Sequence, residues 1–283
     1  MSDYLKIKKH IEKIISESSG NICLSFYDLD DEEGFSVNED KKVRSASMIK
    51  LLIMAEIMNQ SKNGKISLDT KIKVGKKDIV GGSGILKEFD CEHEFSIKEL
   101  MTLMIIVSDN QATNILIDLV GMDNINLMGK RLNLKSASLQ RKMMDIKALE
   151  KGRDNYISAI DVKVILEKIY RKTLVDEKSS ELMLDILLRQ HERQRLGRFL
   201  DEEVKIASKT GDLDKLENDG GIFFLENKNY ILVVLIDDAV TNAMAQETIG
   251  KISKYIYDEM GRWIWKLKVF ISQEKQEQQW TML

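Results

Sequence analysis

Residues that favour β-strands gather near the two ends of this chain, and a long helical stretch separates them. The segments with strand-like apolar patterns are 21–29, 34–38, 204–209, 221–225 and 230–237. From about residue 45 to residue 189 the apolar residues recur at helical spacing, with glycine-containing loops between the segments. Early and late strands can share a sheet only if the helical stretch leaves that sheet and returns to it. The pattern therefore predicts an α+β fold, a five-stranded antiparallel sheet with a mostly helical lobe inserted.

Amphipathic helices are expected to flank this sheet at both ends of the chain. Apolar residues recur at helical spacing over residues 3–18, before Gly20, and again over about 241–260. No run of 18 uncharged apolar residues occurs, so the sequence predicts no membrane-spanning helix.

These elements predict a single domain built from two lobes. Residues 1–261 would form it, with an α/β lobe of about 1–44 and 190–261 and a helical lobe of about 45–189. The segment 262–283 ends in a composition rich in Gln and Glu. We expect it to be a partly disordered C-terminal extension.

Charge and the N-terminal sequence limit the partners and the location of the protein. The chain has 43 basic and 46 acidic side chains, a formal net charge of -3, which gives no reason to expect nucleic acid or an anionic membrane as partner. The first ten residues alternate charged and apolar side chains and contain no secretory signal. The sequence as it stands predicts a cytoplasmic protein, or an extracytoplasmic one if the true start lies upstream.

The cysteines and histidines form no recognisable site. Cys23 and Cys91 cannot make a disulfide framework, and neither has the spacing of a metal site. His10, His93 and His191 are not near a recognisable nucleophile, so a Ser-His-Asp mechanism has little support. We expect neither a metal nor a cofactor.

The first candidate motif is a serine and a lysine three residues apart, Ser47 and Lys50. They open a segment in which nine of the eleven residues 48–58 are apolar, as in a buried helix. A dehydrated lysine favours its neutral form and could then accept the serine proton. The alternative is a helix N-cap serine. The spacing is weak evidence alone, because Ser272 and Lys275 repeat it in the polar tail.

Two further motifs have the residue types that such a serine would need. Ser108, Asp109 and Asn110 lie between two helical segments, where a hydroxyl and an amide could point into a cleft. Alone, the triplet could equally be a turn with a helix cap. The other motif consists of Lys209, Thr210 and Gly211.

This last triplet lies at the end of a predicted strand. Alternation along the strand would turn Lys209 and Gly211 to one face and Thr210 to the other. A cation, a hydroxyl and a glycine that permits close approach suit a substrate with a carboxylate. The ordinary alternative is a strand-to-turn transition.

The three motifs occur together in the order found in class A β-lactamases and penicillin-binding proteins. The chain resembles that family over about residues 20–260, and residues 218–221 resemble the strand after its Lys-Thr-Gly motif. The resemblance implies a two-lobed fold with a cleft between the lobes. It also implies a monomeric hydrolase that forms an acyl-enzyme with a small β-lactam or peptidoglycan-like substrate.

The resemblance also implies a role for each matching residue. Ser47 would attack the carbonyl, and the backbone N–H groups of Ser47 and Asp212 would form the oxyanion hole. Lys50 would be the base or proton relay, and Ser108 would carry the proton to the leaving nitrogen. Asn110 would orient Lys50 and the substrate. The residues implied to bind the substrate carboxylate are Lys209 and Thr210, beside Gly211.

One departure from the family concerns the second half of the reaction. Class A β-lactamases use a glutamate in an omega-shaped loop to activate the deacylating water, but residues 139–152 lack its Glu-x-x-Leu-Asn pattern. Glu150 and Asp145 are the nearby carboxylates, and each could be the base or have only a structural role. We therefore expect a β-lactamase. The alternatives are a penicillin-binding serine hydrolase, esterase or peptidase with slow deacylation, and a binding module without chemistry.

Overall fold

The computed structural model describes residues 3–76, 79–226 and 228–281, and side chains up to Gly261. The strands are β1 (Asn21–Asp28), β2 (Gly34–Val37), β3 (Val43–Arg44), β4 (Lys71–Val74), β5 (His93–Ser96), β6 (Tyr156–Ile157), β7 (Lys205–Leu213), β8 (Leu216–Phe224) and β9 (Asn229–Asp237). The helices are α1 (Asp3–Ser16), α2 (Lys50–Lys62), α3 (Ile97–Ile106), α4 (Asn110–Val120), α5 (Met122–Arg131), α6 (Ile146–Glu150), α7 (Ala159–Tyr170), α8 (Glu177–Leu188) and α9 (Asn242–Thr281), with the short 3₁₀ helices η1 (Ala46–Ile49) and η3 (Leu86–Glu88).

The predicted five-stranded antiparallel sheet is confirmed, in the order β2-β1-β9-β8-β7. Its early and late strands meet where β1 pairs with β9, from Asn21 opposite Asp237 to Asp28 opposite Tyr230. Strand β9 is central and buried along almost its whole length. Because side chains alternate along a strand, Val233 packs into one hydrophobic core and Val234 into the other.

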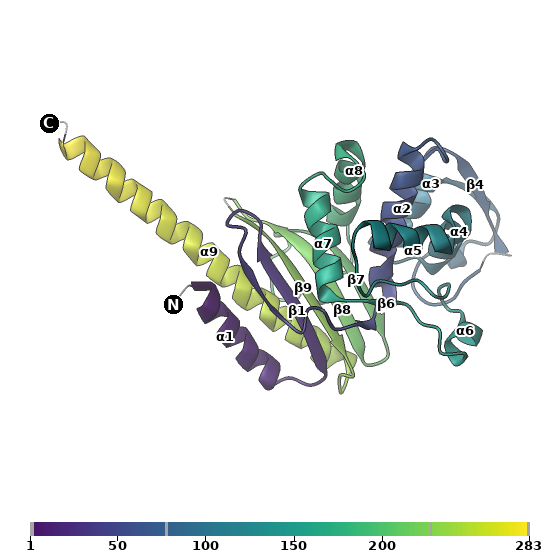
Figure 1. Ribbon diagram of the computed structural model, residues 1–283, viewed down its shortest axis with the longest axis horizontal. Coiled ribbons are helices and arrows are strands. Elements are labelled where there is room, and N and C mark those ends of the chain that lie inside the picture. The colour runs from purple at the N-terminus through teal and green to yellow at the C-terminus, as the bar shows by residue number, and fades with distance from the viewer. Residues whose placement is uncertain (1–2, 77–78, 227, 282–283) are drawn as a thin grey trace.

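The sheet separates two layers of helices (Figure 1). Helices α1 and α9 cover one face, whereas α7 covers the other and leads to the helical lobe beyond β7. Helix α2 lies inside this lobe, and its residues from Leu51 to Met58 are all buried, as their apolar run predicts. The helical lobe and the edge strand β7 thus face each other.

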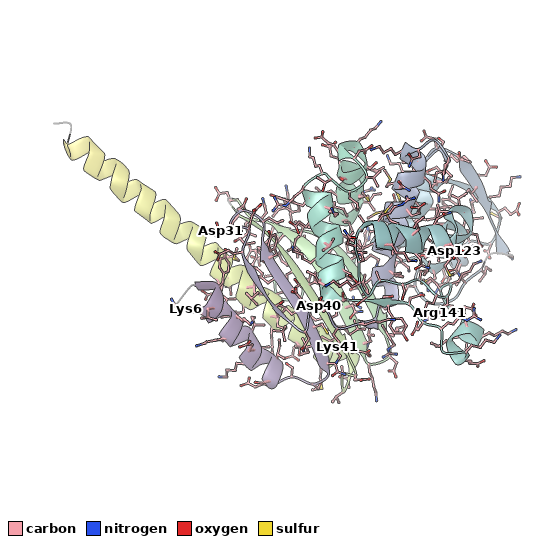
Figure 2. The ribbon with its side chains drawn as sticks, viewed as in Figure 1. Lys6, Asp31, Asp40, Lys41, Asp123 and Arg141 are labelled. Atoms are coloured by element: carbon pink, nitrogen blue, oxygen red, sulfur yellow. The ribbon has the colours of Figure 1, made fainter. Side chains whose placement is uncertain are left out.

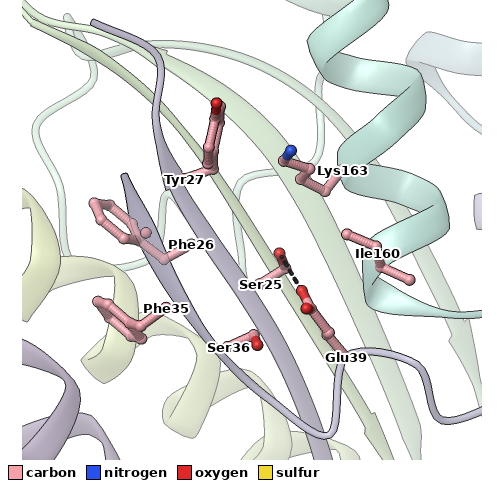
Figure 3. A pocket seen from close by; sticks show the side chains of 9 residues that line it. Ser25, Phe26, Tyr27, Phe35, Ser36, Glu39, Ile160 and Lys163 are labelled. Carbon is pink, nitrogen blue, oxygen red and sulfur yellow. Dashed lines mark hydrogen bonds between the residues drawn. The ribbon is translucent and has the colours of Figure 1, made fainter. Parts of the chain in front are cut away.

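A polar hollow of about 240 Å³ lies beside α7, between this helix and the strands β1 and β2 (Figure 3). At one end the Ser25 hydroxyl donates to the Glu39 carboxylate at 3.1 Å, and at the other Lys163 Nζ lies 3.8 Å from the centre of the Tyr27 ring. The backbone N–H of Ile160 donates to the Glu39 carbonyl oxygen. These contacts hold the start of α7 against the segment that leads into β3 and η1.

The structure extends several elements beyond their predicted ends. Strand β7 runs on to Leu213 because β8 pairs with it along its full length. Helix α9 continues to Thr281 through the segment that was expected to be partly disordered, which contains neither Gly nor Pro to end a helix after Gly261. The short pairs β3–β6 and β4–β5 were not predicted. Within the described residues, no helix is long and apolar enough to cross a bilayer.

Candidate active site

Ser47 lies in the 3₁₀ helix η1, one residue after a strained backbone position. Ala46 has a φ of 45°, which is uncommon for a residue with a side chain. Ser47 is half-buried, and the N-cap positions of η1 and α2 are Ser45 and Ile49. The hydroxyl of Ser47 is therefore not the cap of either helix, which was the alternative to a nucleophile.

Lys50, at the start of α2, reaches the corner between α3 and α4. Its Nζ donates to the Ser108 carbonyl oxygen at 2.7 Å, the Ser108 hydroxyl at 3.1 Å and Asn110 Oδ1 at 3.0 Å. A φ of 54° at Ser108 turns its carbonyl and its hydroxyl toward the same amine. Lys50 is fully buried, and both this burial and the nearby charge of Lys209 hold its pKa well below the usual lysine value. A neutral amine can accept a proton.

The Asp109 carboxylate anchors the corner itself. Its carboxylate accepts from Ala112 N at the start of α4 and from the backbone N–H groups of Ile85 and Leu86. Gly84 packs so closely that an added Cβ would lie 2.3 Å from the Asp109 carboxylate. Asp109 thus fixes the loop over the Ser108–Asn110 corner, a role that the sequence analysis did not assign.

Lys209 approaches the same serine from the opposite lobe. Its Nζ donates to the Ser108 hydroxyl at 3.1 Å and to the Thr210 carbonyl oxygen at 2.8 Å. Burial, together with the positive charge of Arg195, lowers the pKa of Lys209 to about 7. One hydroxyl, that of Ser108, therefore joins two amines that come from separate lobes.

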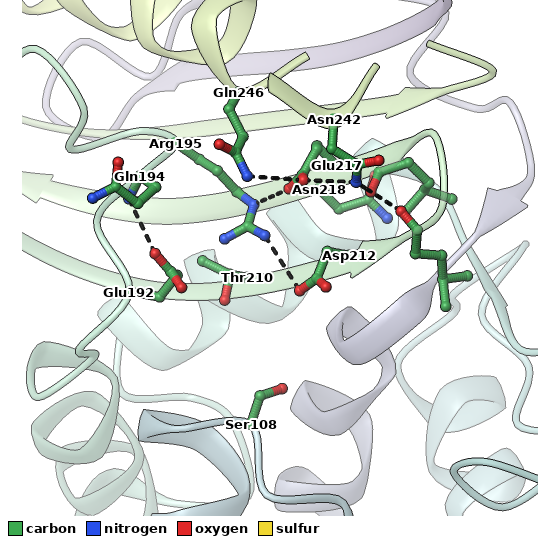
Figure 4. A network of polar contacts seen from close by, with 12 residues as sticks. Ser108, Glu192, Gln194, Arg195, Thr210, Asp212, Glu217, Asn218, Asn242 and Gln246 are labelled. Atoms are coloured by element: carbon green, nitrogen blue, oxygen red, sulfur yellow. Dashed lines mark hydrogen bonds and ion pairs between the residues drawn. The ribbon is translucent and has the colours of Figure 1, made fainter. Parts of the chain in front are cut away.

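Strand β7 passes close to the backbone of η1 just after Lys209. An added Cβ on Gly211 would lie 2.8 Å from Ser47 N and 3.1 Å from Met48 N, so any larger residue would push the strand away. Lys209 and Gly211 face the helical lobe, as alternation predicts. Figure 4 shows that the Thr210 side chain also extends toward the side of β7 on which Ser108 lies, so the opposite direction that alternation predicted for Thr210 is wrong.

A buried charge network behind β7 was missed by the sequence analysis. Arg195 is 4% exposed; its Nη2 lies 3.3 Å from Asp212 Oδ1, and its Nε donates to the Glu217 carboxylate (Figure 4). Leu196 N donates to Asp219, whose pKa burial raises to about 7 although Arg195 opposes the shift. The network places a fixed positive charge beside Lys209. Its members come from three separate segments, and no local motif marks them.

Of these residues, Ser47, Asn110 and Asp212 border a cavity of about 290 Å³ between the two lobes. Its lining residues are Ala46, Ser47, Gly82, Ser83, Asn110, Arg141, Met143, Met144, Asp154, Asn155, Asp212, Leu213 and Asp214. The structure thus brings the nucleophile candidate, the Ser108 corner and the Lys209 strand to one crevice.

The segment expected to contain the deacylation base closes one side of this cavity. An ion pair between Arg141 and Asp154 closes the base of this loop, with Arg141 Nη2 2.8 Å from Asp154 Oδ1. Figure 2 shows Arg141 beside α6. Between Arg141 and Asp154, Met143 is buried and its backbone is held by both ends of the Asn114 amide. A methionine therefore occupies the part of the loop that faces the cavity.

Neither carboxylate named from the sequence lies in the cavity. Glu150 is exposed at the end of α6 and does not line the cavity, so the geometry does not support it as the base. Asp145 caps α6 by accepting from Ala148 N at 3.0 Å, the ordinary preference of aspartate at a helix N-terminus.

Comparison with known proteins agrees with this geometry. The model of the beta-lactamase enzyme family matches residues 6–260. The extended-spectrum β-lactamase PER-1 of Pseudomonas aeruginosa is 25% identical over 261 residues, which cover 86% of this chain and 83% of that protein. The β-lactamase of Sphaerobacter thermophilus superposes with a TM-score of 0.83 at 26% identity, covering 92% and 98% of the two chains.

A third structure shares the fold. It is a variant of PBP-A solved as an acyl-enzyme complex with penicillin G, with a TM-score of 0.83 and 24% identity over 91% of this chain and 97% of that one. The family match spans both lobes and all three motifs of the crevice. This chain therefore belongs to the beta-lactamase enzyme family.

Proposed function

We propose that the protein is a serine hydrolase that opens the cyclic amide of β-lactams through an acyl-enzyme on Ser47. The observation that carries the proposal is the hydroxyl of Ser108, shared by Lys50 and Lys209 at 3.1 Å each beside the cavity that Ser47 lines. Family membership over residues 6–260 supports the reaction class. Every group of the site comes from one chain, so we propose that a monomer suffices.

Acylation would give each of these groups a defined role. The Ser47 hydroxyl oxygen attacks the lactam carbonyl, its proton passes to neutral Lys50, and the developing oxyanion is held by the N–H groups of Ser47 and Asp212. The C–N bond then breaks. Ser108 donates its proton to the leaving nitrogen and recovers one from protonated Lys50, so the amine is neutral again.

Substrate binding would depend on the opposite wall of the crevice. A β-lactam carries a carboxylate, and the Lys209 amine with the Thr210 hydroxyl supplies a cation and a donor for it. Asn110 Nδ2 already donates to the Gly81 carbonyl oxygen at 3.0 Å, and its Oδ1 accepts from Lys50. Asn110 would therefore orient the amine and the loop that borders the substrate.

Hydrolysis of the acyl-enzyme requires a water and a base, and few groups in the cavity could be this base. Of the three carboxylates that line it, Asp154 is paired with Arg141 and Asp212 with Arg195, and Asp214 lies in the turn after β7, not in the loop whose wall Met143 fills. We infer that deacylation is the slow step of turnover. This observation favours, as a second candidate, a penicillin-binding hydrolase that keeps its acyl group for long.

Nitrocefin hydrolysis, followed together with the intact mass of the protein, tests these proposals. Steady colour release shows a β-lactamase, and an adduct that accumulates on Ser47 during turnover shows that deacylation is slow. A lasting stoichiometric adduct without turnover shows the second candidate. If the protein gives no colour and forms no adduct, serine acyl transfer on β-lactams is contradicted.

The charge of Lys209 predicts how acylation depends on pH. We expect kcat/KM for penicillin G to fall as the pH rises through about 7, because Lys209 loses its proton there and no longer attracts the substrate carboxylate. A pH profile from 5.5 to 9 measures this effect. Lys209→Arg keeps its charge at every pH, so its profile should lack the alkaline fall.

The arginine variant also separates Lys209 from Asp219, whose pKa lies in the same range. If the wild-type profile stays level from pH 7 to 9, the charge of Lys209 is not required. If Lys209→Arg keeps the alkaline fall, another group causes it.

A further inference from the structure

Charges of opposite sign lie along the crevice. The amine of Lys209, which donates to the Ser108 hydroxyl, lies beside the part of the crevice where we place the substrate carboxylate. Farther along, at the end of β7 and in the turn to β8, the exposed carboxylates of Asp212 and Asp214 border the same cavity. A substrate that lies along β7 would thus meet positive charge first and negative charge beyond it.

The two carboxylates at this end differ in how far they are neutralised. Asp212 lies 3.3 Å from Arg195, which compensates part of its charge. Asp214 forms no ion pair with any residue in the described part of the chain, so its charge is available to a ligand. Arg141, a cation of the cavity lining, is paired with Asp154 at 2.8 Å.

Apolar side chains line the same cavity as this free carboxylate. Leu213 precedes it on β7, and Met143 and Met144 line the same cavity from the loop of the helical lobe. β7 extends three residues beyond Thr210, about 10 Å, and Asp214 is the first residue of the turn that follows. A molecule with its carboxylate at Thr210 must therefore extend its far end over apolar side chains before it reaches Asp214.

We propose that Asp214 selects β-lactams whose acyl side chain carries an apolar group and a protonated amine. This inference rests on the proposed function and names its substrate class. The amine would pair with the Asp214 carboxylate while the apolar group contacts Leu213 and Met143. Ampicillin and penicillin G test it directly, because they differ by one α-amino group on otherwise identical side chains.

The test compares second-order acylation constants for the two penicillins at pH 6.5, where the amine is protonated. We expect wild type to favour ampicillin, and Asp214→Asn to lower the ampicillin to penicillin G ratio about two- to fivefold, the range of an exposed ion pair. Asp214→Lys should lower it further. Because exposed charges are screened, 0.5 M NaCl should reduce the wild-type ratio toward that of Asp214→Asn.

A matched control removes the same charge elsewhere. Asp69 is exposed in the loop before β4 and does not line the cavity, so Asp69→Asn should leave the ratio unchanged. If the ampicillin to penicillin G ratio is equal in wild type and Asp214→Asn while penicillin G still acylates Ser47, selection by Asp214 is overturned and the proposed function stands. Failure of both penicillins to acylate wild type would instead overturn the proposed function.

Discussion

Replacing Ser47 with alanine is expected to abolish both the nitrocefin colour and the covalent penicillin adduct. The variant has no oxygen to form the ester, and no other hydroxyl occupies its place in η1 beside Gly211. Removal of the nucleophile from a serine hydrolase lowers kcat by about 10⁶-fold, so only the small residual rate supplied by the oxyanion hole and substrate binding should remain. Nitrocefin turnover and the intact mass after incubation with penicillin G measure the two losses.

The chain supplies a control for this variant. Ser272 is followed by Lys275 at the same spacing, in the segment after Gly261. Ser272→Ala should retain wild-type turnover and adduct. A serine and a lysine at this spacing do not form a catalytic site unless the other two motifs lie beside them. An adduct that persists in Ser47→Ala, or is lost in Ser272→Ala, would show that the nucleophile is wrongly assigned. Since Ser47 is half-buried and caps no helix, thermal unfolding of Ser47→Ala should change little.

Much of the fold was predictable because it follows from local patterns. Alternation marks the strands, the all-round apolar run marks buried α2, and the Ser96–Glu99 capping box marks the start of α3, where both of its hydrogen bonds are present. The topology followed as well, since early and late strands with a helical stretch between them can form one sheet by pairing β1 with β9.

The convergence of the three motifs was predictable for a different reason. Each triplet is ordinary alone, and their order along the chain made the resemblance specific. The structure then places the amines of Lys50 and Lys209 on one hydroxyl, that of Ser108. Alternation predicted that Lys209 and Gly211 share a face of β7, but sequence spacing could not provide the direction in which Ser108 points, which depends on its positive φ.

Residues whose role depends on partners from distant segments of the chain could not be identified from the sequence. Arg195 lies in a loop that no motif marks, and its neighbours Asp212 and Glu217 belong to two different strands. The deacylation base could not be located for a related reason. Glu150 is close to the right place in sequence, but Asp145 starts a helical turn whose end exposes Glu150 to solvent.

Replacing Met143 with glutamate is expected to raise turnover of β-lactams by shortening the life of the acyl-enzyme. Met143 lines the cavity with Ser47, and the Asn114 amide fixes its backbone at 2.8 and 3.0 Å. A carboxylate on this backbone could deprotonate the attacking water. General-base catalysis contributes about 10²–10⁴-fold, and imperfect placement can remove about 10²-fold, so we expect an increase of about tenfold, the middle of the range that remains. Decay of the penicillin G adduct by mass spectrometry measures it.

Two further variants identify the cause of the increase. Leu149→Glu adds the same charge to an exposed position of the same segment outside the cavity, and Glu150→Gln removes the carboxylate that the sequence suggested. Both should deacylate like wild type. Burial should raise the pKa of the new glutamate, so its benefit should grow with pH as it ionises, and the protein should lose some stability. Rapid deacylation by wild type would contradict this account, because a carboxylate already present, such as Asp154, would then have to activate the water despite its pairing with Arg141.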